Sequence, residues 1–333
     1  MTISRTQIIV STLALAAVAG LALSPQLLGS RVADAFDVLG SADRGWLLAA
    51  SASFVAAFAC TVGAWRAGFA AAGGRISPRR AASGLGVGAL VNAFAPAKLG
   101  DAVKVALCSC AIEGPGRIWT AGGVYAALAA ARSLALALLV VVASITGAVP
   151  VWPVFALCSI VAVLAAVGAL SGRVRRHPRI AQVLEGFAAL ERSPRALATV
   201  LGWTIAMVAC RLAGTVAVVA ALGLPQPLLA ALLILPALDV ASAFPITPGS
   251  IGIGTGAVAV ALASRGIAMS QAIGTGLALQ AVETLVSIGV GSLGALWLAN
   301  EHAVVRRWTL RLAAVGGSVA AALLGYLLLN LTT

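Results

Sequence analysis

Long apolar runs separated by short charged loops recur along the whole chain. An uninterrupted apolar run of about 20 residues is long enough to cross the hydrocarbon core of a bilayer as a helix. Of the 333 residues, 61% are hydrophobic and 10% are charged, whereas soluble domains are roughly half apolar and a quarter charged. A transmembrane β-barrel would instead show alternating apolar and polar residues. We therefore predict an all-α, polytopic integral membrane protein, and we exclude a soluble enzyme.

About seven of the apolar runs are expected to cross the membrane completely. The positive-inside rule places the intervening basic loops and Arg5 in the cytoplasm, so the N-terminus is expected to be cytoplasmic. Alanine- and arginine-rich, lysine-poor usage indicates a bacterial source, and hence the cytoplasmic (plasma) membrane. These loops also account for the net charge of +12, so we expect no nucleic-acid partner. The expected spans are residues 8–28, 46–70, 119–149, 155–170, 197–222, 272–299 and 310–329.

Two further apolar segments, residues 82–111 and 228–264, are interrupted by proline and glycine. Each is too interrupted to be a continuous span and too apolar to be a loop, which is typical of re-entrant helical hairpins. The residues expected to shape the hairpin tips are Pro96 and Gly100 in the first segment, and Pro248, Gly249 and Gly252 in the second.

The two interrupted segments belong to units with the same order of elements. Each segment is followed by a long apolar helix and then by one more span, and Pro248 follows Pro96 by 152 residues. The expected topology brings the first hairpin in from the cytoplasm and the second from outside. We therefore predict one membrane domain, residues 1–333, that contains an inverted repeat. The first repeat covers about residues 46–171 and the second about residues 197–330. Such pairs of broken helices indicate a transporter with a binding site near the midplane.

Ionisable side chains at membrane depth are costly, so each is a functional candidate. Lys98 and Lys104 are the only lysines of the chain, and Asp101 lies three residues from each. On a helix these three residues would form a positively charged cluster, which suits an anionic phosphate headgroup. The alternative is that Asp101 only neutralises the lysines at an interface.

Arg132, Asp239 and Glu283 are further candidates for the substrate-binding site. Arg132 lies too far from the ends of its expected helix to reach the interface easily. The two acids either pair with Arg132 or Arg211 or take part in proton coupling. No arrangement of nucleophile and base, paired carboxylates or metal-ligand cluster is recognisable, so we expect no catalytic residue, no metal and no cofactor.

Residues 92–104 read Asn-Ala-Phe-Ala-Pro-Ala-Lys-Leu-Gly-Asp-Ala-Val-Lys, and residues 244–254 read Phe-Pro-Ile-Thr-Pro-Gly-Ser-Ile-Gly-Ile-Gly. These stretches resemble the lysylphosphatidylglycerol synthase transmembrane-region family, a flippase-like membrane domain. Arg132 falls where the family usually carries an arginine, and the order of segments is similar along nearly the whole chain. The resemblance adds Asn92 to the residues expected to contact the substrate.

Several positions depart from the family pattern. Thr255 replaces an acidic residue after the second glycine-rich turn, and Gln280 replaces an arginine in the next helix. Alanines replace the acids that usually flank the arginine, and Glu283 is a candidate for the lost carboxylate.

Three classes of function remain open at this stage. In fused relatives a soluble aminoacyl-transferring domain follows the membrane part, and this chain stops at Thr333 after its last expected helix. The resemblance therefore implies translocation of an anionic phospholipid or a polyprenyl-phosphate-linked substrate, without synthase activity. The alternatives are an intramembrane transferase, whose base would be Asp101, Asp239 or Glu283, and a non-catalytic subunit of a separately encoded cytoplasmic enzyme. A homo-oligomer also remains open.

Overall fold

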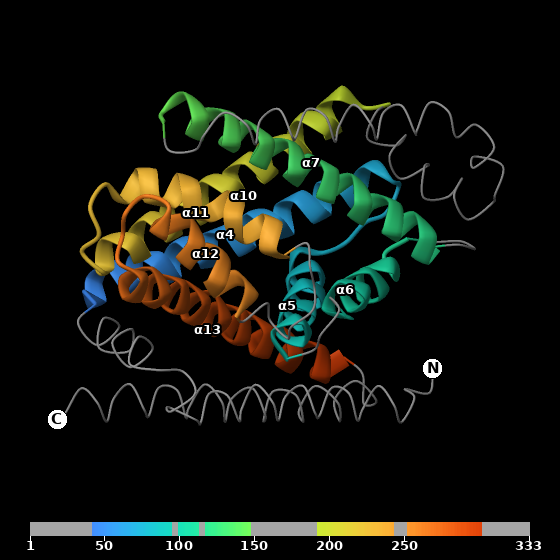
Figure 1. The fold of residues 1–333 in the computed structure, drawn as a ribbon. Coiled ribbons are helices and arrows are strands. Elements are labelled where there is room, and N and C mark those ends of the chain that lie inside the picture. The colour runs from blue at the N-terminus through green and yellow to red at the C-terminus, as the bar shows by residue number, and fades with distance from the viewer. Residues whose placement is uncertain (1–41, 95–98, 113–116, 148–191, 243–251, 302–333) are drawn as a thin grey trace, which may run out of the picture.

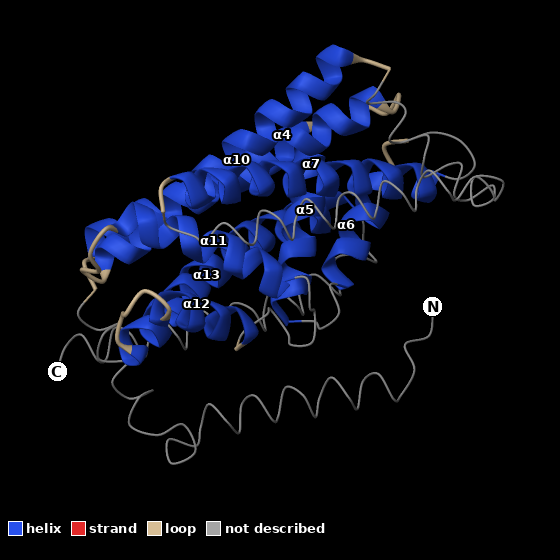
Figure 2. Cartoon of the chain, turned by 45° about the horizontal axis from the view of Figure 1, so that its top comes forward, coloured by secondary structure: helices blue, strands red, loops and turns tan. Residues whose placement is uncertain are grey.

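The computed structural model describes residues 42–94, 99–112, 117–147, 192–242 and 252–301 (Figure 1). These residues form eight helices and no strand, which confirms the predicted all-α class (Figure 2). The helices are α4 (Arg44–Ala71), α5 (Pro78–Phe94), α6 (Leu99–Ser109), α7 (Arg117–Ile145), α10 (Pro194–Ala221), α11 (Pro227–Ser242), α12 (Ile253–Ala263) and α13 (Met269–Glu301).

Four of these helices, α4, α7, α10 and α13, are long and apolar enough to cross a membrane. They correspond to the spans predicted at residues 46–70, 119–149, 197–222 and 272–299. The chain is therefore membrane-embedded through at least these helices. The other three predicted spans, residues 8–28, 155–170 and 310–329, lie outside the described residues.

Each of the two interrupted segments forms a pair of short helices that pack against each other, α5 with α6 and α11 with α12. The pairs lie toward opposite ends of the bundle (Figures 1 and 2). Helix α5 begins at Pro78, four residues before the predicted start at residue 82, so Arg79 and Arg80 belong to its first turn. The tips of both pairs, residues 95–98 and 243–251, lie outside the described residues.

Helices α4 and α10 share the same kind of N-terminal cap and the same kind of C-terminal glycine, at positions 150 residues apart. Asp43 Oδ1 accepts hydrogen bonds from the N–H groups of Gly45 (2.7 Å) and Trp46 (3.2 Å), and Ser193 caps α10 in the same way. These caps satisfy N–H groups that have no partner within the helix. Gly73 and Gly223 follow the helices with φ angles of 80° and 66°, which glycine adopts most readily.

The eight helices follow the order long, short, short, long twice. The contacts of one half recur in the other: α6 packs on α7 as α12 packs on α13, and α5 packs on α13 as α11 packs on α7. Helices α4 and α10 pack against each other between α7 and α13 (Figure 1). They run antiparallel, because the N–H of Asp43 at the start of α4 donates to the carbonyl oxygen of Ala221 at the end of α10 (2.9 Å).

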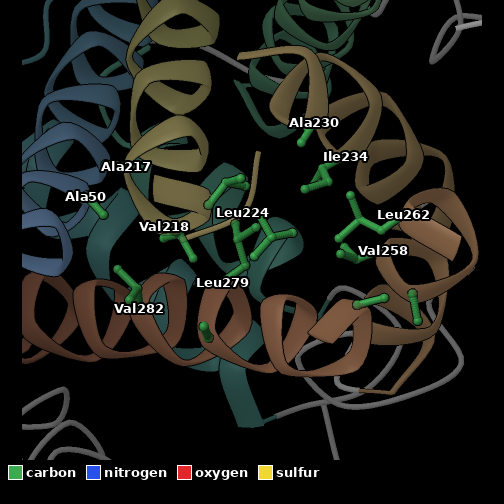
Figure 3. Close-up of a cluster of buried hydrophobic side chains, with 14 of the residues drawn as sticks. Ala50, Ala217, Val218, Leu224, Ala230, Ile234, Val258, Leu262, Leu279 and Val282 are labelled. Carbon is green, nitrogen blue, oxygen red and sulfur yellow. The ribbon is translucent and has the colours of Figure 1, made fainter. Parts of the chain in front are cut away.

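Two large apolar cores lie on either side of the contact between α4 and α10. One joins α10–α13 to the first part of α4 through Ala50 (Figure 3). The other joins α5–α7 to the last part of α4, around Trp65 and Phe69, and it includes Val200 from the start of α10. Each of the two central helices therefore contributes to both cores, and together they hold the halves against each other.

Candidate functional site

A cavity of 370 Å³ lies among α4, α5, α6, α7, α10 and α13. Its wall contains aromatic and aliphatic side chains together with polar and ionisable ones. Those polar and ionisable residues are Thr61, Asp101, Lys104, Tyr125, Arg132, Thr204, Arg211, Glu283 and Ser287. Because α13 and α10 line it together with α6 and α7, the cavity takes functional groups from both halves of the bundle.

Asp101, on the first turn of α6, is the centre of one polar cluster. Its Oδ1 accepts hydrogen bonds from Lys104 Nζ (2.8 Å) and Asn92 Nδ2 (2.9 Å), and its Oδ2 accepts one from Tyr125 Oη (2.8 Å). Asn92 also accepts a hydrogen bond from the N–H of Gly100 (2.7 Å). The amide of Asn92 therefore joins the end of α5 to the beginning of α6, and Tyr125 ties both to α7.

Glycines allow α5 and α6 to approach this closely. A Cβ atom at Gly100 would lie 2.0 Å from the carbonyl oxygen of Gly88, and one at Gly88 would lie 2.2 Å from Lys104 Cγ. One turn earlier, Gly84 faces Cys108 on α6. The Gly84 and Gly88 pair is thus a small-xxx-small contact between neighbouring helices, a common way to bring helices together in membranes.

Asp239 is the centre of a second cluster. Arg132 Nη2 donates to its Oδ1, and Arg211 Nη1 donates to both of its oxygens (3.0 and 3.2 Å). Arg211 Nη2 also donates to Glu283 Oε1 (3.1 Å). The four residues come from α7, α11, α10 and α13, so ionic contacts connect four helices around one point.

The two clusters contain three cations and three carboxylates among the described residues, so their formal charges balance. The side chains of Asp239 and Arg211 are only 11% and 16% exposed, and buried charges of this kind require close partners. Arg132 is 42% exposed. Of the six ionised side chains, that of Arg132 is therefore the most exposed.

The structure brings most of the predicted site residues together. Asp101, Lys104, Arg132 and Glu283 line the cavity. Asn92 and Asp239 bond directly to these side chains but are not among the described residues that line the wall. The predicted residues Pro96, Lys98, Pro248 and Gly249 lie outside the described residues.

The predicted tip glycines that are described occupy special positions. Gly100 makes the close contact with α5, and Gly252 precedes α12 with φ 94°, a conformation that L side chains rarely adopt. Thr255 occupies the third position of α12, as Asp101 does in α6. It is buried, and its hydroxyl has no hydrogen-bond partner among the described residues.

Sequence reasoning missed Tyr125. The chain has only two tyrosines, and Tyr125 lies seven residues before Arg132, so the two share one face of α7. That spacing could have identified it. Among the described residues, no group of three or more His, Cys, Asp or Glu side chains could hold a metal ion.

Comparison with curated proteins gives no match. A family model does match the chain: the family described as "Lysylphosphatidylglycerol synthase TM region" matches residues 8–291. That range includes every described residue of the cavity wall and both ionic clusters. The chain therefore belongs to the lysylphosphatidylglycerol synthase transmembrane-region family.

Proposed function

We propose that this protein moves a lipid or lipid-linked anionic substrate between the leaflets of the bacterial cytoplasmic membrane. The observation that carries the proposal is the gathering of six ionisable side chains in and against one cavity, among helices long enough to cross the bilayer. Charges at this depth are retained mainly where they form a pathway or a binding site. A lipid-handling family supports the same class of substrate.

An inverted repeat with two re-entrant hairpins explains the arrangement best. Recurring contacts in the two halves, and an antiparallel pair of central helices, support a two-fold axis that lies in the membrane plane. Such repeats place the substrate site near the midplane and let one half move against the other. We extend this to seven spans, with the N-terminus in the cytoplasm.

Arg132 is the proposed contact for the substrate phosphate. Its planar guanidinium carries five donors, it lines the cavity, and it is more exposed than Arg211. Lys104 and Lys98 would add positive charge, and Asp101 would orient Lys104 through their 2.8 Å ion pair. Arg211, held between Asp239 and Glu283, would position the cluster rather than bind the substrate.

The transferase alternative needs a carboxylate available as a base. Asp101 accepts hydrogen bonds from three side chains, and Asp239 bonds to two arginines. Glu283 is bonded to Arg211. Carboxylates held in this way favour a structural and electrostatic role over proton abstraction, so we favour transport. No contact of the described residues favours the partner-subunit alternative.

Leaflet exchange in proteoliposomes tests the proposal. Fluorescent phosphatidylglycerol and polyprenyl-phosphate analogues would be compared for the native chain and for Arg132→Gln, Lys104→Gln and Lys98→Ala. The exposed Arg195 at the start of α10 supplies the control variant, Arg195→Gln. We expect exchange by the native and control proteins and at least about a tenfold loss in Arg132→Gln, the loss of one charged hydrogen bond. Exchange at the rate of empty vesicles, with the protein shown to be folded, would refute the transport function.

A further inference from the structure

A second cavity, of 270 Å³, lies outside the ionic clusters in a groove between α4, α5 and α13. Most of its wall is apolar, with Phe58 at the inner end and the strongly exposed side chain of Leu293 at the surface. Arg79, on the first turn of α5, is the only ionisable residue among the described residues of this wall. The groove is therefore an apolar surface with one cation.

Arg79 lies over the ring of Trp297 on α13, with Cζ 5.7 Å from the ring centroid. A guanidinium stacked on an indole is held by the ring face, while the N–H donors along its edge remain able to bond to an anion. Arg79 is exposed, and Trp297 is partly exposed at 39%. A tryptophan beside a basic residue is typical of the membrane–water interface, where lipid phosphates lie.

The walls of the groove are fixed by close backbone contact between α5 and α13. A Cβ atom at Gly294 would lie 2.9 Å from the carbonyl oxygen of Ser83, and one at Gly86 would lie 2.6 Å from the carbonyl oxygen of Val290. Contacts this short leave no room for side chains between the two helices. The spacing of the two helices that carry Arg79 and Trp297 is therefore set by direct backbone packing and not by flexible loops.

The groove adjoins the inner cavity. Phe58 and Val290 belong to the walls of both spaces, so these two side chains stand between them. Each therefore contacts both the inner cavity, which holds the ionic clusters, and the groove that contains Arg79. A molecule with an anionic head and an apolar tail would match the groove, because the groove combines the cation of Arg79 with an apolar wall.

We propose that the groove is a docking site for one anionic phospholipid taken from the surrounding bilayer. Its phosphate binds the edge of the Arg79 guanidinium, and an acyl chain lies along Leu293 and Trp297. The site is separate from the inner cavity and holds lipid whether or not transport occurs. That the docked lipid continues past Phe58 and Val290 to Arg132 rests on the proposed function.

The docking site is tested by lipid retention. The delipidated full-length protein in detergent is titrated with phosphatidylglycerol or phosphatidylcholine of identical acyl chains, and bound lipid is counted by native mass spectrometry. All variants carry Arg132→Gln, so that the inner phosphate contact does not contribute. We expect preferential retention of phosphatidylglycerol, about tenfold weaker in Arg79→Gln. The exposed neighbour Arg75 gives the control, because Arg75→Gln should bind as the parent does.

A second pair of variants tests the groove rather than the charge. Ala82→Phe fills the groove and should abolish retention of both lipids, whereas Ala49→Phe, on the exposed face of α4, should change nothing. Equal retention by the parent, Arg79→Gln and Ala82→Phe would overturn the docking site, and so would equal retention of the two lipids by the parent.

Failure of the docking site and failure of the transport function are distinguishable. If retention depends on Arg79 but the native protein gives no leaflet exchange, the docking site stands and the transport function falls. If exchange depends on Arg132 but retention is indifferent to Arg79 and Ala82, the reverse holds. Phe58→Trp narrows the boundary between the two spaces, so it should slow exchange. Unaltered exchange in Phe58→Trp would overturn the route past Phe58.

Discussion

Replacing Gly100 by alanine should separate α5 from α6. The new Cβ atom would lie 2.0 Å from Gly88 O, and contacts under 3.0 Å essentially do not occur, so the helices must move apart by 1.0 Å or more. That movement would stretch the 2.7 Å hydrogen bond from Gly100 N–H to Asn92 beyond useful length. Overpacking costs about 1–3 kcal/mol and the lost hydrogen bond about 1 kcal/mol.

Gly256 provides the matched control. It lies on the first turn of α12, in the other pair of short helices, and a Cβ atom there would meet nothing within 4 Å. Alanine has a higher helix propensity than glycine at both sites by up to about 1 kcal/mol, and this gain cancels in the comparison. Gly100→Ala should therefore be less stable than Gly256→Ala by about 2–4 kcal/mol. Unfolding in SDS, followed by circular dichroism, measures the difference. Equal midpoints for the two variants would refute the close contact between α5 and α6.

Three further pairs of substitutions test the polar contacts by the same unfolding measurement. Asp239→Asn should lose about 3 kcal/mol because it removes the charge that faces two arginines, Arg132 and Arg211, and leaves Arg132 without a charged partner among the described residues, and Glu283→Gln about 1 kcal/mol because it removes the charge from a single hydrogen bond to Arg211; equal losses would contradict the central position of Asp239. Asn92→Ala should destabilise more than Tyr125→Phe, which loses about 1 kcal/mol, because Asn92 bonds to both Asp101 and Gly100; the reverse order would show that the amide does not join the two helices. Asp43→Ala should lose about 1 kcal/mol through the helix cap of α4, whereas Asp43→Ser should retain most of it; no difference between these two would exclude capping.

The long helices were predictable because the hydropathy of an apolar run is averaged over about 20 residues, so single polar residues do not hide it. The predicted boundaries of the four described spans agree with α4, α7, α10 and α13 to within a few residues, apart from the undescribed end at residues 148–149. Each of the two interrupted segments forms two short helices, α5 with α6 and α11 with α12, while the predicted tip residues Pro96, Pro248 and Gly249 lie outside the described residues. The early start of α5 was missed, although Ser77 before Pro78 is a helix-start signal and Ser77 Oγ accepts a hydrogen bond from the N–H of Arg80.

The pairing of charges could not be predicted in the same way. Arg132 and Asp239 are 107 residues apart, and sequence reveals which groups are costly to bury but not which of them meet. The alternatives for Asp239 included Arg132 or Arg211, and the structure shows that it bonds to both. Tyr125 escaped notice because an aromatic side chain in an apolar helix suggests packing, and its hydroxyl finds Asp101 only through the contact of α6 with α7.

Among the described residues, Arg132 and Asp239 form the one ion pair between the first four helices and the last four. An anion that binds Arg132 must compete with this carboxylate for the same guanidinium. The free energy needed to break the Arg132–Asp239 ion pair lowers the apparent affinity of the cavity for the anion. By thermodynamic reciprocity, a bound anion weakens the contact between α7 and α11 by the same free energy. The binding of an anion in the cavity and the ionic contact between the two halves are thus governed by one equilibrium, in which Arg132 binds either the anion or Asp239.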